Sequence, residues 1–235
     1  MTPRQSNMVF YSVIALIICG LAVNALYPDF FEDLSKSKEE LAIKEAVSQG
    51  EHAKALPIYQ QLIDKKISNN NVNTVETAEL YESMASSYAQ LGNKVEAKNN
   101  YLAALDIKLK IEKVNPYSVA STYFTLGEIA EDEKQYDQAQ SYYESALAKQ
   151  LGDTKRKDKE GVFEGLQNAQ IEYKRLNNPY TIASLKKLGA LHAMKQESAM
   201  AKDYYERALA ASKTTFGDDD AKTLEVIKLI KQLKL

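Results

Sequence analysis

The chain has 235 residues, of which 45% are hydrophobic and 26% charged, and its formal net charge at neutral pH is −2. This composition is typical of one globular domain with an appendage, and the lack of a basic excess argues against a nucleic-acid partner. The single cysteine, Cys19, excludes an internal disulfide. Neither histidine, His52 or His192, stands in a cluster with the spacing of a metal site.

The first element in chain order is an uncharged apolar stretch, Met8–Leu26. Its 19 residues come close to the roughly 20 that a helix needs to span a bilayer. Arg4 precedes the stretch and three acidic residues follow it, so the positive-inside preference places residues 1–7 in the cytoplasm. We therefore expect residues 8–26 to form a single-pass transmembrane signal anchor in a bacterial inner membrane, with the remainder of the chain in the periplasm.

Three other interpretations of this stretch stay open. Cleavage after Ala25 would remove it, although it is longer than the apolar core of most cleaved signal peptides. Lipid attachment at Cys19 is disfavoured because Ile18, rather than a small residue, precedes the cysteine. The reverse topology also stays open, because the charge difference across the stretch is small.

The rest of the chain is expected to be helical, because apolar residues recur at alternating steps of three and four. Residues 27–36 are expected to be a linker and residues 37–235 one helical domain. The predicted elements are helix pairs at about 37–67, 73–112, 117–151 and 180–213, an inserted helix at 157–177 and a capping helix at 218–234.

Several punctuating residues set these boundaries. Pro57 implies a kink or a displaced start in the second helix of the first pair. Asn-Pro at 115–116 and at 178–179 ends the preceding segment, since the residue before proline disfavours the helical region. The run Thr214–Gly217 is expected to end the last pair. The inserted helix carries an apolar stripe at Val162, Leu166, Ala169, Tyr173 and Leu176.

A 42-residue internal repeat organises the predicted helices. Tyr59, Tyr101 and Tyr143 follow one another at this interval. A fixed period of this length is typical of a solenoid, in which no unit buries its apolar face alone. Small residues let paired helices approach closely, and aromatic residues fill the space beside them. The packing positions are Ala85, Ala97, Tyr101, Gly127, Ala139, Tyr143, Gly189, Ala201 and Tyr205.

This order of small and aromatic residues resembles the tetratricopeptide repeat (TPR) family over residues 36 to 235. The period is 42 rather than the usual 34 or so, which is similar to the long repeats of kinesin light chains. The resemblance implies an all-α solenoid of antiparallel helix pairs that binds protein or peptide partners. It implies neither an enzyme nor a cofactor. Gly127 and Gly189 are 62 residues apart, so about 20 residues are inserted between their repeats.

The resemblance also implies a binding groove on the concave side. The groove positions are Glu82, Ser86, Gln90, Phe124, Glu128, Glu131 and Asp132. Their charge would suit a basic peptide or helix. The inserted helix either packs against the core, occupies or shapes this surface, or contacts a helix of a partner. Self-association through the groove also stays open.

No motif suggests catalytic residues, so the expected function is a membrane-anchored scaffold or adaptor in a cell-envelope complex. Two alternatives stay open. One is a periplasmic chaperone or assembly factor for a secretion or pilus system. The other is an accessory or regulatory subunit of an envelope enzyme.

Overall fold

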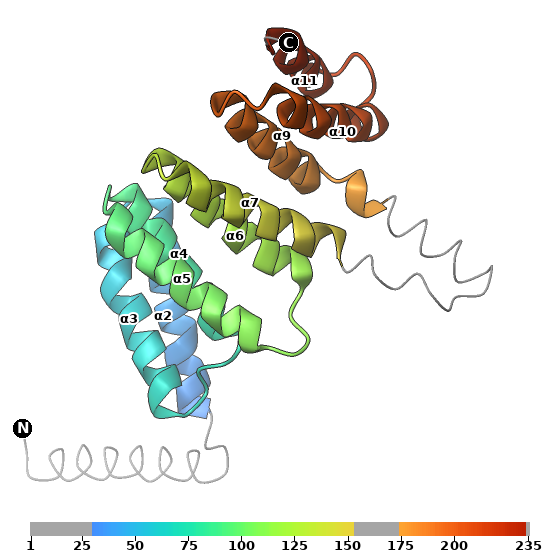
Figure 1. Ribbon diagram of the computed structural model, residues 1–235. Coiled ribbons are helices and arrows are strands. Elements are labelled where there is room, and N and C mark those ends of the chain that lie inside the picture. The colour runs from blue at the N-terminus through green and yellow to red at the C-terminus, as the bar shows by residue number, and fades with distance from the viewer. Residues whose placement is uncertain (1–29, 153–173, 234–235) are drawn as a thin grey trace, which may run out of the picture. The chain divides into compact units, whose positions relative to one another are not determined.

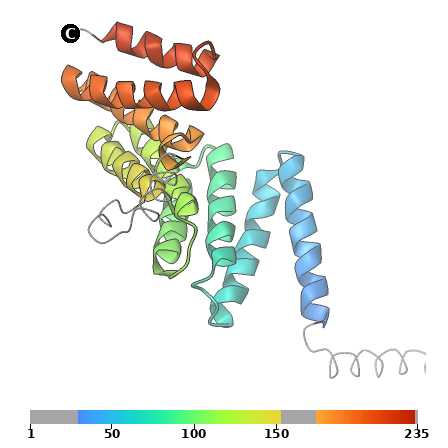
Figure 2. The same ribbon diagram turned by 90° about the vertical axis from the view of Figure 1, so that its right-hand side faces the viewer.

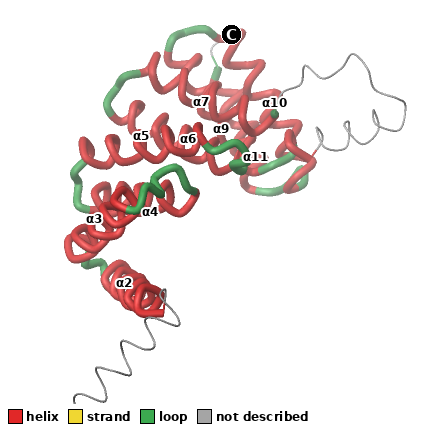
Figure 3. Tube along the Cα trace, turned by 90° about the horizontal axis from the view of Figure 1, so that it is seen from below, coloured by secondary structure: helices red, strands yellow, loops and turns green. Residues whose placement is uncertain are grey.

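The computed structural model describes residues 30–152 and 174–233, and no strand occurs among them. Within each of these two ranges, short loops join the helices (Figures 1 and 3). The helices are α2 (Phe30–Ser48), α3 (His52–Ser68), α4 (Val75–Gln90), α5 (Lys94–Lys110), α6 (Pro116–Asp132), α7 (Tyr136–Leu151), α9 (Pro179–Met194), α10 (Ser198–Phe216) and α11 (Ala221–Gln232). Two compact units result, one ending at Gln61 and one beginning at Leu62.

The first unit contains α2 and most of α3. Its buried side chains include Ala46, Ala55 and Tyr59, and the Gln61 side-chain amide donates to a Glu39 carboxylate oxygen at 3.0 Å. Helix α2 begins at Phe30, so the prediction of a linker at 27–36 is wrong from that residue on. The reason is local, because no glycine or proline interrupts the run of helix-forming residues after Pro28.

Pro57 does not displace the start of its helix, which begins at His52 and continues to Ser68.

The second unit is built from three consecutive helix pairs, α4–α5, α6–α7 and α9–α10, and is closed by α11 (Figure 1). The orange-to-red helices α9, α10 and α11 lie one over the next in Figure 2. We call α4, α6 and α9 the first helices and α5, α7 and α10 the second helices. The predicted inserted helix falls mainly on residues 153–173, which lie outside the described residues, and only 174–176 of it are described as helical.

The two Asn-Pro sequences start the first helices of the later repeats. The Asn115 side-chain oxygen accepts from the Tyr117 backbone N–H at 3.0 Å, and Asn178 caps Tyr180 in the same way at 2.9 Å. Proline then occupies the first helical position, where its missing N–H costs no hydrogen bond. These motifs therefore do more than end the preceding segments, because they fix where α6 and α9 begin.

Glycine and tyrosine make the tightest contact within two of the pairs. A Cβ added to Gly127 would lie 2.6 Å from the ring of Tyr143, and one added to Gly189 would lie 2.6 Å from the ring of Tyr205. The two rings are 0% and 3% exposed. In the preceding pair Ala85 occupies the glycine position. Its partner Tyr101 is only half-buried.

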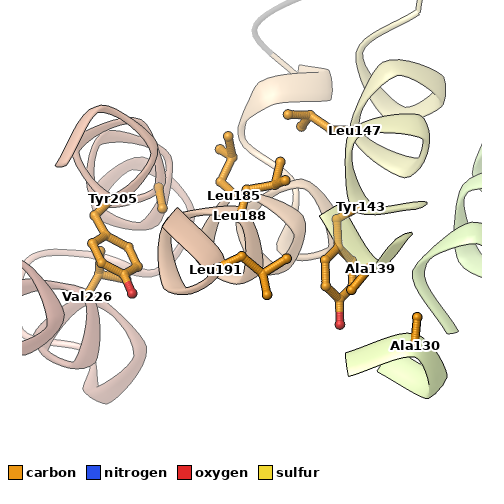
Figure 4. Close-up of a cluster of buried hydrophobic side chains, with 10 residues drawn as sticks. Ala130, Ala139, Tyr143, Leu147, Leu185, Leu188, Leu191, Tyr205 and Val226 are labelled. Atoms are coloured by element: carbon orange, nitrogen blue, oxygen red, sulfur yellow. The ribbon is translucent and has the colours of Figure 1, made fainter. Parts of the chain in front are cut away.

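The remaining small packing positions, Ala97, Ala139 and Ala201, are buried. Figure 4 shows three leucines of α9, Leu185, Leu188 and Leu191, between Tyr143 on one side and Tyr205 on the other. These residues belong to one cluster with Val226 of α11. The closing helix therefore covers the last apolar face, as solenoids require.

The end of the last pair differs from the prediction. Helix α10 continues into the expected break and ends at Phe216, where Gly217 is the C-cap with a φ of +98° that favours glycine. Thr214 is accommodated because its hydroxyl donates to the Ala210 carbonyl at 3.1 Å. Helix α11 begins at Ala221, with Asp220 as its N-cap, rather than at residue 218.

Candidate protein-binding site

Glu82, the first of the predicted groove residues, pairs with a buried lysine. Its Oε1 accepts from Lys108 Nζ at 2.6 Å and from the Thr122 hydroxyl at 2.6 Å. Lys108 is 1% exposed, and it also donates to the Ser118 carbonyl at 3.2 Å. A buried ammonium requires such partners to offset its lost hydration. Glu82 therefore contributes a compensated charge, in contrast to the free groove charge expected from the sequence.

The acidic residues of α6 form what we call the acid cluster: Glu128, Glu131 and Asp132. Glu131 Oε2 accepts from Lys187 Nζ of α9 at 2.9 Å and from the Tyr143 hydroxyl at 2.7 Å. Glu128 Oε1 lies 3.8 Å from the same Lys187 Nζ. Lys187 thus lies near two carboxylates. It reduces the negative charge of the acid cluster, but one ammonium does not neutralise both carboxylates.

Asp132 pairs with Lys94 of α5, whose Nζ lies 3.0 Å from Asp132 Oδ2. Both side chains are mainly exposed, so this pair is weak.

The pKa values of nearby groups reflect the acid cluster. Burial raises the pKa of Glu128, and although Lys187 lowers it, Glu131 and Asp132 raise it further. Burial and the hydrogen bond to Glu131 raise the pKa of Tyr143. A cation placed beside Glu128 would relieve this repulsion.

The remaining predicted positions on α4, Ser86 and Gln90, are exposed. Tyr101 links this helix to α6. Burial raises the Tyr101 pKa, the Glu82 carboxylate adds to the rise, a hydrogen bond with Ser86 opposes it, and Glu128 adds a smaller contribution. The phenol therefore lies within electrostatic range of carboxylates on α4 and α6.

Beside the acid cluster lies an aromatic pocket that sequence reasoning missed. Its volume is about 370 Å³, which falls in the range of small-ligand sites. Its lining residues are Asn115, Tyr117, Ser118, Ser121, Phe124, Gln150, Tyr180 and Ala183. The sequence does carry one signal of it, since Asn-Pro-Tyr occurs at the start of both α6 and α9 and places Tyr117 and Tyr180 at equivalent positions.

Phe124 joins the pocket to the acid cluster. It lines the pocket and packs on Tyr143, with ring centroids 5.3 Å apart and planes tilted by 55°. The Tyr143 hydroxyl in turn donates to Glu131, and Lys187 Nζ lies 5.8 Å from the Tyr143 ring centroid. We call the acid cluster and the aromatic pocket together the first-helix face. Of the predicted residues, Phe124, Glu128, Glu131 and Asp132 belong to it.

Of the two histidines, His192 is a packing residue. His192 is 5% exposed, stacks on Tyr204 with centroids 5.3 Å apart, and bonds Glu197 through Nδ1. Within residues 30–152 and 174–233, no group of three or more metal-binding side chains converges.

The described part of the chain contains no helix that is both long and apolar enough to cross a bilayer. The predicted anchor at 8–26 lies outside that part.

Comparison with known proteins supports the repeat class. Sequence models described as tetratricopeptide repeat match residues 78–110, 120–148 and 181–221. These segments coincide with the helix pairs α4–α5, α6–α7 and α9–α10. The described fold is therefore an all-helical, TPR-like solenoid. No curated protein matches the chain in sequence.

Two solved structures illustrate the likeness. TPR-like repeats of a putative kinesin light chain from Podosopora anserina have a TM-score of 0.60 and 16% identity, over 84% of each chain. BtubC (BKLC) from P. vanneervenii has a TM-score of 0.52 and 16% identity, over 79% of this chain and 63% of that protein. At these identities the likeness concerns the fold. The repeats themselves suggest a scaffold for protein–protein interaction, and no catalytic family is indicated.

Proposed function

We propose that this protein is a membrane-anchored adaptor whose first-helix face binds a basic segment of a partner protein in the cell envelope. The observation that carries the binding proposal is the incomplete neutralisation of Glu128 and Glu131. Both carboxylates share the single ammonium of Lys187, at 3.8 and 2.9 Å. Burial raises the pKa of Glu128, Lys187 opposes that rise, and Glu131 and Asp132 add to it. A lysine or arginine of the partner would supply the missing positive charge.

The neighbouring pocket adds the apolar contact that charge alone does not give. Rim charges mainly govern the association rate and partner choice, whereas buried aromatic contacts supply most of the binding free energy. Phe124 connects the two parts, so one short peptide or helix would contact both.

The membrane part of the proposal stands on the sequence. The uncharged stretch at 8–26 has the length of a bilayer span, and the charges around it favour a periplasmic repeat domain. Alkaline carbonate extraction of native membranes tests it. The full chain should stay in the membrane pellet, while a variant lacking residues 1–26 should be released. Release of both the full chain and the shortened variant would show that residues 1–26 do not anchor the protein.

The binding part is tested with a photo-crosslinking amino acid placed in the full chain in cells that naturally contain it. The test positions are Ser121 of α6, which lines the aromatic pocket, and Ser86, a predicted groove residue exposed on α4. The control position is Glu206, exposed on α10. We expect one crosslinked partner from the two test positions and none from the control. Adding Glu128→Gln should weaken that crosslink.

Other crosslinking patterns would contradict the adaptor. Many unrelated products from both faces would favour the chaperone. A product with twice the mass of the chain would indicate self-association.

A further inference from the structure

The aromatic pocket contains a buried polar group that the described fold does not use. Gln150 of α7 lines the pocket and is 3% exposed, and its Oε1 has no hydrogen-bond partner among the described residues. A buried acceptor without a partner lowers the free energy of unfolding. Nearly all buried polar groups in proteins therefore form a hydrogen bond. Gln150 is therefore an acceptor ready for a donor supplied by a ligand.

The rest of the lining restricts what that ligand can be. Three rings, Tyr117, Phe124 and Tyr180, provide apolar surface, and Ser118 and Ser121 provide hydroxyl groups. None of the lining residues carries a charge. Lysine or arginine would lose hydration there without a carboxylate to compensate, which is unfavourable.

We propose that the pocket binds a tyrosine side chain of the partner segment, so this inference rests on the proposed function above. The tyrosine ring matches the aromatic lining. Its hydroxyl donates to Gln150 Oε1, while its oxygen accepts from a serine hydroxyl. Phenylalanine lacks both bonds, and the indole of tryptophan donates only.

The surroundings of the pocket determine the residues beside that tyrosine. Glu128 lies four residues after Phe124 on α6, which is one helical turn along the same face. The segment recognised is consequently a tyrosine with basic neighbours. The 66% exposure of Tyr180 leaves its ring available to contact such a segment.

The test uses three acetylated and amidated probe peptides of sequence Lys-Lys-Xaa-Lys-Lys, where Xaa is tyrosine, phenylalanine or leucine. Their affinities for the full chain in detergent micelles are measured by isothermal titration calorimetry. The serine hydroxyl exchanges a bond to water for one to the ligand, so the preference comes from the bond to the otherwise unpaired Gln150 Oε1. That bond predicts that the tyrosine peptide binds about fivefold more tightly than the phenylalanine peptide.

In a Gln150→Met variant the tyrosine preference should disappear, while binding of the phenylalanine peptide persists and reports an intact fold. Glu206→Gln, an exposed carboxylate on α10, serves as the control and should leave all three affinities unchanged.

Three outcomes would overturn the inference. If the three peptides bind with equal affinity and Glu128→Gln weakens all three equally, the face binds a basic segment but the pocket does not recognise tyrosine. Absence of binding by any peptide would remove both proposals. Binding that appears only after deletion of residues 153–172 would assign the pocket to the chain's own inserted segment.

Discussion

Gly127→Ala tests the close contact between Gly127 of α6 and the Tyr143 ring of α7, which sets the distance between these paired helices. The new Cβ would lie 2.6, 2.7 and 3.0 Å from three ring atoms of Tyr143. Real Cβ atoms do not approach so closely, and the ring has little freedom to move. It is fully buried, packs on Phe124 and donates its hydroxyl to Glu131. The helix or the ring must therefore shift.

Two opposing contributions set the magnitude. Overpacking a close-packed core costs about 1–3 kcal/mol. Replacing glycine by alanine inside a helix contributes about 1 kcal/mol in the other direction. We expect the free energy of unfolding to fall by about 0–2 kcal/mol. Gly189→Ala should behave alike because Tyr205 makes the same contact.

The assay is urea denaturation of the full chain in detergent micelles, followed by circular dichroism. A double-mutant cycle with Tyr143→Leu supplies the control, because without the ring the added methyl has nothing to meet. Gly127→Ala should be neutral or stabilising in that background. Stabilisation by about 1 kcal/mol in the wild-type background, as helix propensity alone predicts, would refute the reasoning.

Three further predictions concern charges and caps. Glu82→Ala leaves the buried Lys108 ammonium without its carboxylate partner and should lower the free energy of unfolding by about 3 kcal/mol, as measured by urea denaturation. The double variant Glu82→Leu, Lys108→Met removes both charges and should be nearly as stable as the wild type. The raised pKa of Glu128 means that its charged form opposes folding, so Glu128→Gln should match or exceed wild-type thermal stability at neutral pH. That advantage should vanish as the pH falls through the folded-state pKa of Glu128; a constant difference would contradict it. Asp220→Ala removes the α11 N-cap and should cost about 1 kcal/mol, seen as faster hydrogen exchange in α11.

Local pattern was sufficient to predict most of the fold. Apolar spacing identified the helices, and the recurrence of Tyr101 and Tyr143 identified the repeat, because both signals are visible along the chain without knowing which helices are in contact. The errors were also local. The helix that begins at Phe30 and the continuation of α10 past Thr214 were missed because helix ends depend on caps and side-chain bonds worth little individually.

The binding role of the candidate site stays a prediction. The sequence placed Phe124 and the acid cluster together because residues one turn apart on a first helix share a face. Their electrostatic state was not predictable, because Lys187 lies 56 residues from Glu131 in the sequence and meets it only when α9 packs beside α6. Glu82 was misjudged for the same reason, since Lys108 reaches it from another helix.

The sequence by itself therefore determined the helix pairs, their repetition and the residues that pack within each pair, all of which follow from periodicity and residue size. Only the tertiary structure decided which charges are compensated and where a pocket remains. Gln150 shows why. Nothing in its neighbourhood along the chain distinguishes it from an exposed polar residue of a helix. It becomes a buried acceptor because α6, α7 and α9 meet around it.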